Sequence, residues 1–150
     1  MSPQVNLVPI APVEISQILS LVREFYALEN MVLTEAVAKS YGALLEQPEW
    51  GRLFWIQFDG AIAGYGAVTF FYSFEYHGRS AIIDELYLSA DFRGQGIGGS
   101  ALAQLEHFCR QQGVACLNLV VAAQNDAAQK LYAKHGFETL KRQLCIKWLI

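Results

Sequence analysis

The sequence predicts a mixed α/β fold in a single domain, residues 1–150. The spacing of apolar residues switches several times between a period near 3.6, typical of helices, and a period near 2, typical of strands. The dipeptide Asp59-Gly60 favours positive φ and predicts a tight hairpin turn, and a second hairpin is predicted near His77-Gly78. A glycine-rich stretch at 93–99 separates a strand-like run from a helix-like run. Together these observations indicate strands joined partly by hairpins and partly by helices.

The first half of the chain predicts a strand, two helices and two further strands. Pro12 opens a helix whose apolar residues recur at helical spacing as far as Tyr26. Thr34 is placed to cap a second helix, which Pro48 would stop. The strands predicted in this half cover residues 5–10, 52–58 and 61–74.

The second half predicts strands that alternate with helices. The helix after the glycine-rich stretch is expected to end at Gly113. Asn125 or Asp126 caps a last helix that runs to His135, and Gly136 is a natural left-handed stop. The strands predicted in this half are 80–89, 114–121 and one or two in the tail, 137–150.

The composition predicts a self-sufficient domain that binds neither nucleic acid nor a membrane. With 150 residues, of which 53% are hydrophobic, the chain can bury a sizeable core. The net charge is −3 and the eleven Lys and Arg form no run, which argues against a nucleic-acid partner. The N-terminus lacks the pattern of a secretory signal, and the apolar runs are too short to cross a bilayer. We therefore expect a cytoplasmic protein.

The cysteines and histidines predict neither a disulfide framework nor a metal site. Cys109, Cys116 and Cys145 are odd in number, lack a CxxC pattern and fall in apolar segments, so we expect reduced, buried thiols. The three histidines are single and lie apart from other ligand types, so surface or packing roles are expected for them.

The stretch Arg93-Gly94-Gln95-Gly96-Ile97-Gly98-Gly99 has the composition of a phosphate-binding loop. Glycines let backbone N–H groups converge without Cβ obstruction, and the following helix N-terminus adds partial positive charge. A P-loop is excluded because no Lys follows the glycines. A Rossmann loop is disfavoured because the next strand, around 117–121, ends without an acid. A glycine-rich turn without a ligand stays open as the structural alternative.

These residues resemble the GNAT superfamily of acetyl-CoA-dependent N-acetyltransferases. Its pyrophosphate-binding motif reads Arg or Gln, x, x, Gly, x, Gly or Ala, and residues 93–98 match it fully. Asp84-Glu85-Leu86-Tyr87-Leu88 resembles the family's fourth strand, and the stretch from Asn125 to Gly136-Phe137 resembles its next helix and strand. The resemblance covers residues 80–137, whereas the first half agrees in the order of elements only.

The resemblance implies a GNAT fold and acetyl-CoA as cosubstrate, with no metal. The fold would be a three-layer α/β (α+β) arrangement: a mixed, mostly antiparallel central sheet of six to seven strands, with the fourth and fifth strands splayed apart, flanked by four helices. Backbone N–H groups of the loop and Arg93 would hold the diphosphate, the fourth strand would line the pantetheine arm, and Asn125 would hydrogen-bond that arm. The cofactor-binding residues implied are Leu86, Tyr87, Leu88, Arg93, Gly94, Gln95, Gly96, Ile97, Gly98, Gly99 and Asn125.

The chemistry of acetyl transfer to an amine suggests a base and an acid. A primary amine with a pKa near 10.4 is mostly protonated at pH 7, so a base is useful. Asp84 and Glu85 are candidates and resemble the acidic pair of spermidine/spermine N-acetyltransferases, although adjacent strand residues face opposite ways unless a bulge intervenes. The alternative is that one carboxylate is solvated and the other bridges to Arg79. By resemblance, Tyr132 would protonate the departing thiolate, while periodicity alone makes it a core aromatic and makes Asn125 a helix cap.

The acceptor is expected to be a small, cationic amine. Tyr26, Tyr72 and Glu75 are the candidate substrate-binding residues, because an acid among aromatic rings suits a cation with an apolar body. Ordinary hairpin aromatics are the alternative. Two other functions stay open: a protein N-terminal or lysine acetyltransferase with an open groove, and a non-catalytic acyl-CoA-binding regulatory module. The apolar run at 144–150 predicts either a homodimer contact or a core strand.

Overall fold

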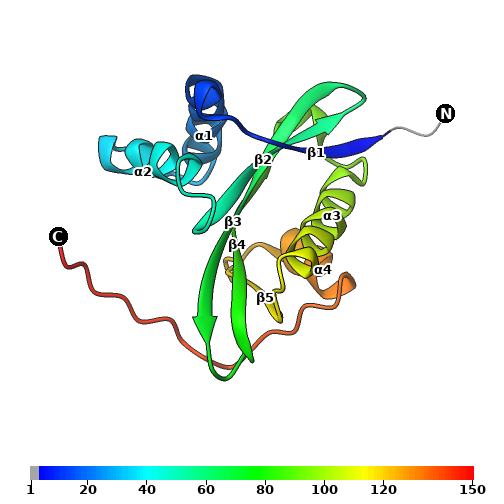
Figure 1. Cartoon of the computed structure of the whole chain (residues 1–150). Helices are drawn as coiled ribbons and strands as arrows, with labels where there is room; N and C mark the ends of the chain where they lie inside the picture. Colours follow the sequence, from blue (N-terminus) through cyan, green and yellow to red (C-terminus); the bar gives the residue numbers. More distant parts are fainter. Residues whose placement is uncertain (1–3) are drawn as a thin grey trace. The chain divides into compact units, whose positions relative to one another are not determined.

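The computed structural model describes residues 4–150, which divide between two compact units, residues 4–120 and 121–150 (Figure 1). The first unit contains the sheet and the helices α1 to α3. The second contains helix α4 and the C-terminal tail. The prediction of one domain is not tested by this division and stays a prediction.

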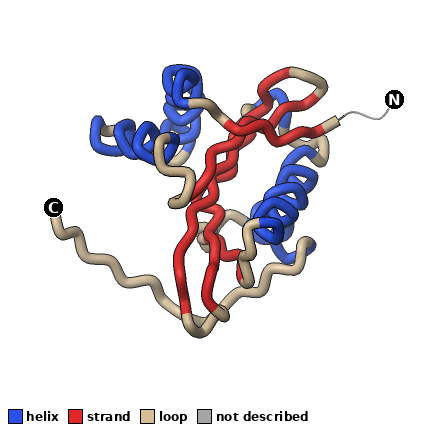
Figure 2. The backbone as a smooth tube through the Cα atoms, in the orientation of Figure 1, coloured by secondary structure: helices blue, strands red, loops and turns tan. Residues whose placement is uncertain are grey.

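The first unit is built on a five-stranded sheet with the order β1-β2-β3-β4-β5 (Figure 2). Successive strands from β1 to β4 are antiparallel, and β5 pairs parallel to β4. A parallel pair needs a long crossover, which α3 supplies. The strands are β1 (Val5–Pro9), β2 (Gly51–Phe58), β3 (Ala61–Ser73), β4 (Gly78–Leu88) and β5 (Cys116–Leu119).

Both predicted hairpins are present. Asp59 and Gly60 have φ values of 48° and 84° in the β2–β3 turn, so both adopt the left-handed conformation that a two-residue hairpin loop requires. In the β3–β4 hairpin, His77 and Gly78 have φ values of 66° and 107°. The local chemistry of the turns therefore sets where the long antiparallel strands reverse.

The helices of the first unit are α1 (Ile15–Leu28), α2 (Glu35–Leu45) and α3 (Ile97–Gln111), with short 3₁₀ turns at Pro12–Glu14 and Ala90–Phe92. Pro12 opens the turn that leads into α1, as expected for a residue without a backbone N–H. The Thr34 hydroxyl accepts a hydrogen bond from Val37 N at 3.2 Å and caps α2 as predicted. Helix α2 ends before Pro48, also as predicted.

Helices α1 and α2 cover one face of the sheet (Figure 1). Ile18 and Val22 of α1 and Tyr41 of α2 are buried against Leu53 and Trp55 of β2. Burial of apolar surface is the main favourable contribution to this contact. The cluster extends to Tyr65 and Ala67 of β3 and to Tyr87 near the end of β4.

Helix α3 covers the opposite face of the sheet. Its Ile97 and Ala101 are fully or nearly fully buried against Ile56 of β2 and Ala63 of β3. Gln104 of α3 also donates from Nε2 to the Val5 carbonyl of β1 at 2.7 Å. These contacts hold the first turn of α3, and with it the glycine-rich loop, against the sheet.

A β-bulge interrupts the pairing of β3 with β4. Ala67 pairs with Glu85 and the next residue, Val68, pairs with Ile83, so Asp84 is left without a partner on β3. A bulge adds one residue to one strand and re-aims its side chains. Adjacent residues on either side of such a position no longer alternate strictly between the two faces.

The pairing of β4 with β5 ends just before the bulge. Their parallel pairing stops at Ile83 and Leu119, while β4 continues to Leu88. The edge of β4 that faces β5 is therefore unpaired in the sheet from Asp84 onward. The open edge follows from the end of β5 at Leu119, and the predicted splaying of the fourth and fifth strands stays a prediction.

The second unit contains α4 (Asp126–Lys134) with a well-defined cap at each end. The Asn125 side chain accepts a hydrogen bond from Ala128 N at 3.2 Å. Gly136 has a φ of 88°, and Phe137 N donates to the Tyr132 carbonyl at 3.0 Å. The Tyr132 and Phe137 rings meet edge to face at 5.8 Å. This is a Schellman stop with its usual apolar contact, which gives Tyr132 and Phe137 a local structural role.

Two expectations about the C-terminal part are wrong. Five strands are present in the described residues rather than six or seven, because the tail at 137–150 forms no strand there. Its last residues are an apolar run that is compatible with a strand, but a strand needs the hydrogen bonds of a neighbouring one. Cys145 is exposed on this tail instead of buried, whereas Cys109 is buried and Cys116 half-buried, all three with free thiols.

None of the helices among residues 4–150 is both long enough and apolar enough to cross a bilayer.

Candidate active site

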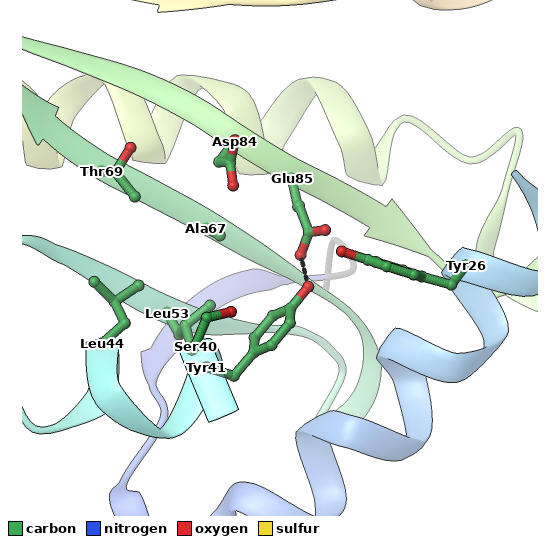
Figure 3. A pocket seen from close by; sticks show the side chains of 9 residues that line it. All are labelled: Tyr26, Ser40, Tyr41, Leu44, Leu53, Ala67, Thr69, Asp84 and Glu85. Carbon is green, nitrogen blue, oxygen red and sulfur yellow. Dashed lines mark hydrogen bonds between the residues drawn. The ribbon is translucent and has the colours of Figure 1, made fainter. Parts of the chain in front are cut away.

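Asp84 and Glu85 line the same cavity, because the bulge turns both side chains toward it (Figure 3). The cavity measures about 210 Å³ and lies between α1, α2 and the strands β2 to β4. Its lining residues are Tyr26, Ser40, Tyr41, Leu44, Leu53, Ala67, Thr69, Asp84 and Glu85. The set includes two carboxylates and neither Lys nor Arg, so the cavity is electronegative.

Tyrosine hydroxyls surround the carboxylate of Glu85. The Tyr41 hydroxyl, from α2, donates to Glu85 Oε1, and the Tyr65 hydroxyl, from β3, donates to the same oxygen at 3.1 Å. Tyr26, from α1, points its hydroxyl toward the same carboxylate in Figure 3. Asp84, in contrast, is exposed to solvent at the same cavity.

The surroundings raise the pKa of Glu85. Burial raises it most, because it disfavours the charged form, and the neighbouring Asp84 adds to the rise. Hydrogen bonds from Tyr41, Tyr65 and Tyr26 work in the opposite direction, because they stabilise the carboxylate. Burial and Glu85 together raise the pKa values of Tyr41 and Tyr65, which keeps both phenols protonated. Glu85 is thus a carboxylate with more basic character than an ordinary surface acid.

The glycine-rich loop presents open backbone at the N-terminus of α3. Gly94 and Gly96 have φ values of 73° and 79°, and a Cβ built on either would meet no atom within 4 Å. The first N–H groups of a helix have no acceptor within it and carry partial positive charge, which suits an anion. Ile97 is 1% exposed, so its side chain belongs to the core and only its backbone N–H can serve such a site.

Arg93 is held beside this loop by two contacts. Its Nε donates to the Leu88 carbonyl at 2.9 Å, and its guanidinium lies 5.6 Å from the centre of the Tyr87 ring. The Tyr87 and Ser89 hydroxyls both donate to Glu24 Oε2 of α1 at 3.2 Å. The end of β4, the arginine and α1 are therefore tied together next to the loop.

The unpaired edge of β4 offers backbone groups near the same place. Leu86 and Leu88 pack their side chains on the α3 face, and Tyr87 packs on the face of α1 and α2. One edge of this stretch pairs with β3. The backbone N–H and C=O groups on its other edge have no partner strand, because the pairing with β5 ends at Ile83. These groups and the loop fit an elongated ligand with an anionic end, which is the shape and charge of coenzyme A.

Residues 17–137 match the Acetyltransferase (GNAT) family. The chain belongs to this family. The match spans most of both compact units, confirms the predicted family and fold class, and supports the prediction of an acyl-transferring enzyme.

Named acetyltransferases are among the similar proteins. The chain is 32% identical over 79 residues to a thialysine N-epsilon-acetyltransferase of Bos taurus, covering 53% of this chain and 46% of that protein. It is 28% identical over 115 residues to a putative [ribosomal protein bS18]-alanine N-acetyltransferase of Bacillus subtilis (strain 168), covering 75% and 72%. The alignment thus spans less than half the length of the thialysine enzyme.

The fold matches that of a solved aminoglycoside N-acetyltransferase. That enzyme was crystallised in complex with CoA and is 12% identical in sequence, with a TM-score of 0.81 over 100% of this chain and 98% of its own. Identity this low shows a shared fold and no more.

Two predicted acceptor residues of this GNAT chain lie away from the cavity. Tyr72 and Glu75 are in the β3–β4 hairpin, Tyr72 is 73% exposed, and neither is among the lining residues. The hairpin tip extends beyond the part of β4 that lines the cavity. Of the three predicted acceptor residues, the structure brings only Tyr26 to Asp84 and Glu85.

Asn125 and Tyr132 lie in the second unit of the GNAT chain, where both have local contacts. Two roles were predicted for Asn125, and the structure shows one of them: it caps α4. Tyr132 is half-buried against Phe137, and burial raises the pKa of its hydroxyl. A protonated phenol at neutral pH is compatible with an acid, and that role stays a prediction.

The sequence alone did not single out Tyr41 and Tyr65 as partners of Glu85. They lie 44 and 20 positions from it in the chain, so only the tertiary structure brings them together. Tyr41 falls on the buried stripe of α2, where an aromatic residue indicates core packing. The hydroxyl of a buried tyrosine still needs a hydrogen-bond partner. That requirement was the feature of the sequence that could have indicated a polar partner for Tyr41.

Among residues 4–150, no group of three or more His, Cys, Asp or Glu side chains gathers as a metal site would.

Proposed function

We propose that this chain is an acetyl-CoA-dependent N-acetyltransferase that acetylates a primary amine of a small, cationic acceptor. The observation that carries the proposal is the pair Asp84 and Glu85 at the bulge, facing one cavity without a lysine or arginine. Neither carboxylate belongs to the ion pairs Glu35–Lys39 and Glu106–Arg110.

The donor side of the reaction is assigned to the loop and the edge of β4. Backbone N–H groups of residues 94–99, with Arg93 beside them, would hold the diphosphate of the coenzyme. Backbone groups of Leu86, Tyr87 and Leu88 would hold the pantetheine arm, and an N–H there would stabilise negative charge on the carbonyl oxygen. Bound acetyl-CoA supplies the activated acetyl group as a thioester. Asn125 is proposed to contact the same arm.

Glu85 is assigned as the base. The ammonium group first loses one proton to solvent, which frees the lone pair. The amine nitrogen then forms a bond to the thioester carbonyl carbon, the carbon–sulfur bond breaks, and the nitrogen loses its second proton. Glu85 takes that proton, directly or through a water, and Tyr132 is proposed to protonate the thiolate. The raised pKa of Glu85 suits this role, because a base works best when its pKa approaches the working pH.

Asp84 and the tyrosine rings are assigned to recognition of the cation. Asp84 is exposed at the cavity and adds a second negative charge beside Glu85. The face of an aromatic ring attracts an ammonium group, and Tyr26 and Tyr41 line the same space. The cavity is smaller than typical drug-sized pockets, so it would hold the amine end of an acceptor rather than a whole large molecule.

A protein N-terminal acetyltransferase is the second candidate, favoured by the likeness to a relative named for the alanine of a ribosomal protein. A lysine acetyltransferase or a non-catalytic acyl-CoA-binding module would also keep the loop. A free N-terminus is itself a cation, but a peptide also needs a groove for its following residues. The cavity volume of about 210 Å³ favours the small amine.

The proposal also includes a homodimer in the cytoplasm. Apolar side chains of the tail, such as Leu144 at 79% and Trp148 at 81%, are exposed in the isolated chain. An apolar patch of this kind is typical of an interface.

A turnover screen tests the function. Free thiol release from acetyl-CoA is followed with polyamines, amino acids, aminoglycosides and short peptides as acceptors. We expect turnover with a small cationic amine and its loss in Glu85→Gln. Turnover with peptides alone would support the second candidate, and coenzyme binding without any acceptor would support the binding module.

A further inference from the structure

Two tyrosines hold one oxygen of Glu85 from two different elements. Tyr41 reaches it from α2 and Tyr65 from β3, and both donate to Oε1 rather than one to each oxygen. Each hydroxyl is a single donor, so both donors of the pair are committed to this oxygen. Oε2 receives neither of these two hydrogen bonds, and the Tyr26 hydroxyl also points toward the carboxylate (Figure 3).

Both rings are fixed by the packing around them. Tyr65 is fully buried and Tyr41 is 7% exposed. The Tyr65 ring contacts Phe25 at 6.4 Å edge to face and Tyr87 at 6.1 Å. Rings packed this way cannot follow a moving carboxylate, so the carboxylate must take the position that the hydroxyls define.

We propose that Tyr41 and Tyr65 are positioning residues, which hold Oε1 of Glu85 and so assign Oε2 to the incoming amine. The inference rests on the proposed role of Glu85 as the base. The bulge re-aims the Glu85 side chain, and the two tyrosines then select one orientation of its carboxylate. A base within hydrogen-bond reach of the proton is what general base catalysis requires.

The groups around Glu85 give the positioning a measurable signature. Its titratable neighbours are Tyr26 on α1, Tyr41 on α2, Tyr65 on β3 and Asp84 on β4, while β2 contributes only Leu53 and Trp55. Burial and Asp84 raise the pKa of Glu85, and the tyrosine hydrogen bonds lower it. Removing one hydroxyl must therefore raise that pKa further.

The first test is a titration that needs neither coenzyme nor acceptor. Carbon-13 NMR of glutamate side-chain carboxyls is followed with pH, and Glu85→Gln identifies the Glu85 signal. We expect the Glu85 titration to move up by about one pH unit in Tyr41→Phe and in Tyr65→Phe. Tyr76→Phe is the matched control, because Tyr76 packs on Phe71 away from the cavity, and it should leave the titration unchanged.

The second test is the pH profile of kcat/KM with the best acceptor from the screen. The acidic limb should move up in both Phe variants, with thermal unfolding close to that of the parent chain. An unmoved Glu85 titration in Tyr41→Phe and Tyr65→Phe would overturn the positioning role, whatever happens to activity. If Tyr65→Phe fails to fold, Tyr41→Phe alone decides.

The two proposals fail in different ways. A shifted NMR titration together with full activity of Glu85→Gln would contradict the base, and with it the assignment of Oε2. An inactive Glu85→Gln with an unshifted titration in the Phe variants would contradict the positioning alone.

Discussion

At the scale of single residues, Asp84 and Glu85 are adjacent in the chain but differ in their surroundings. Glu85 is partly buried among phenols and Asp84 is exposed, although both line the same cavity. Different surroundings can give neighbouring carboxylates different roles. The sequence already suggested that a bulge would let both acids serve, and the structure contains that bulge. It did not show that burial would raise the pKa of Glu85.

Asp84→Asn is predicted to affect binding more than chemistry. Loss of one exposed charge removes about 1 kcal/mol of attraction for a cation, so KM should rise about five-fold while kcat stays within two-fold. Steady-state kinetics with a cationic and a neutral amine checks this, because the neutral acceptor should be affected less. An equal loss for both acceptors would refute the role of Asp84 in attracting charge.

Tyr132→Phe separates the two roles predicted for this residue. The ring keeps its contact with Phe137, so the thermal unfolding temperature should stay close to that of the parent chain. If the hydroxyl protonates the thiolate, kcat should fall by about 10². Unchanged turnover in this variant would leave Tyr132 with its structural role only.

At the scale of elements, the predictions that held depend on local chemistry. The hairpin at Asp59-Gly60, the cap at Thr34 and the stop at Gly136 each depend on residues close together in the chain. The cluster of tyrosines on Glu85 depends on packing between α2, β3 and β4, which no local pattern encodes. For the same reason, the position of Tyr72 and Glu75 outside the cavity was visible only in the structure.

The glycine-rich loop leads to a prediction for which the other end of α3 provides a matched control. Gly96 precedes the helix with a φ of 79°, and Gly113 follows it with a φ of 74°, and neither has an atom near its Cβ position. Alanine at either site costs about 1–2 kcal/mol of unfolding free energy because of the left-handed backbone. Only Gly96→Ala should also weaken CoA binding, by about ten-fold or more in calorimetry. Equal CoA affinity in the two variants would contradict the assignment of the loop.

At the scale of the whole molecule, the C-terminal tail is where the sequence-based prediction and the structure differ. The apolar run at 144–150 predicted either a core strand or a homodimer contact, and its residues are exposed in the isolated chain. A pattern of side chains specifies which face is apolar, but not which edge or which chain will cover it. The predicted number of strands and the predicted burial of Cys145 were therefore wrong for the same reason: nothing in the local pattern specifies what covers the tail.

Removal of residues 144–150 tests the proposed dimer. Sedimentation should show a dimer for the full chain and a monomer for the shortened one, with the spectrum of the folded protein retained. A full-length chain that sediments as a monomer at all concentrations would contradict the dimer.

The account as a whole depends on Glu85 as the base for an amine. Its most direct test is the pH dependence of kcat/KM for thiol release, measured for the parent chain and for Glu85→Gln. Because the pKa of Glu85 lies above the ordinary value of 4.5, activity of the parent chain should fall as the pH drops through that raised pKa. Glu85→Gln should lose about 10²–10⁴ in kcat/KM at neutral pH and should also lose this acidic limb. A Glu85→Gln enzyme with parental activity and the same acidic limb would contradict the account.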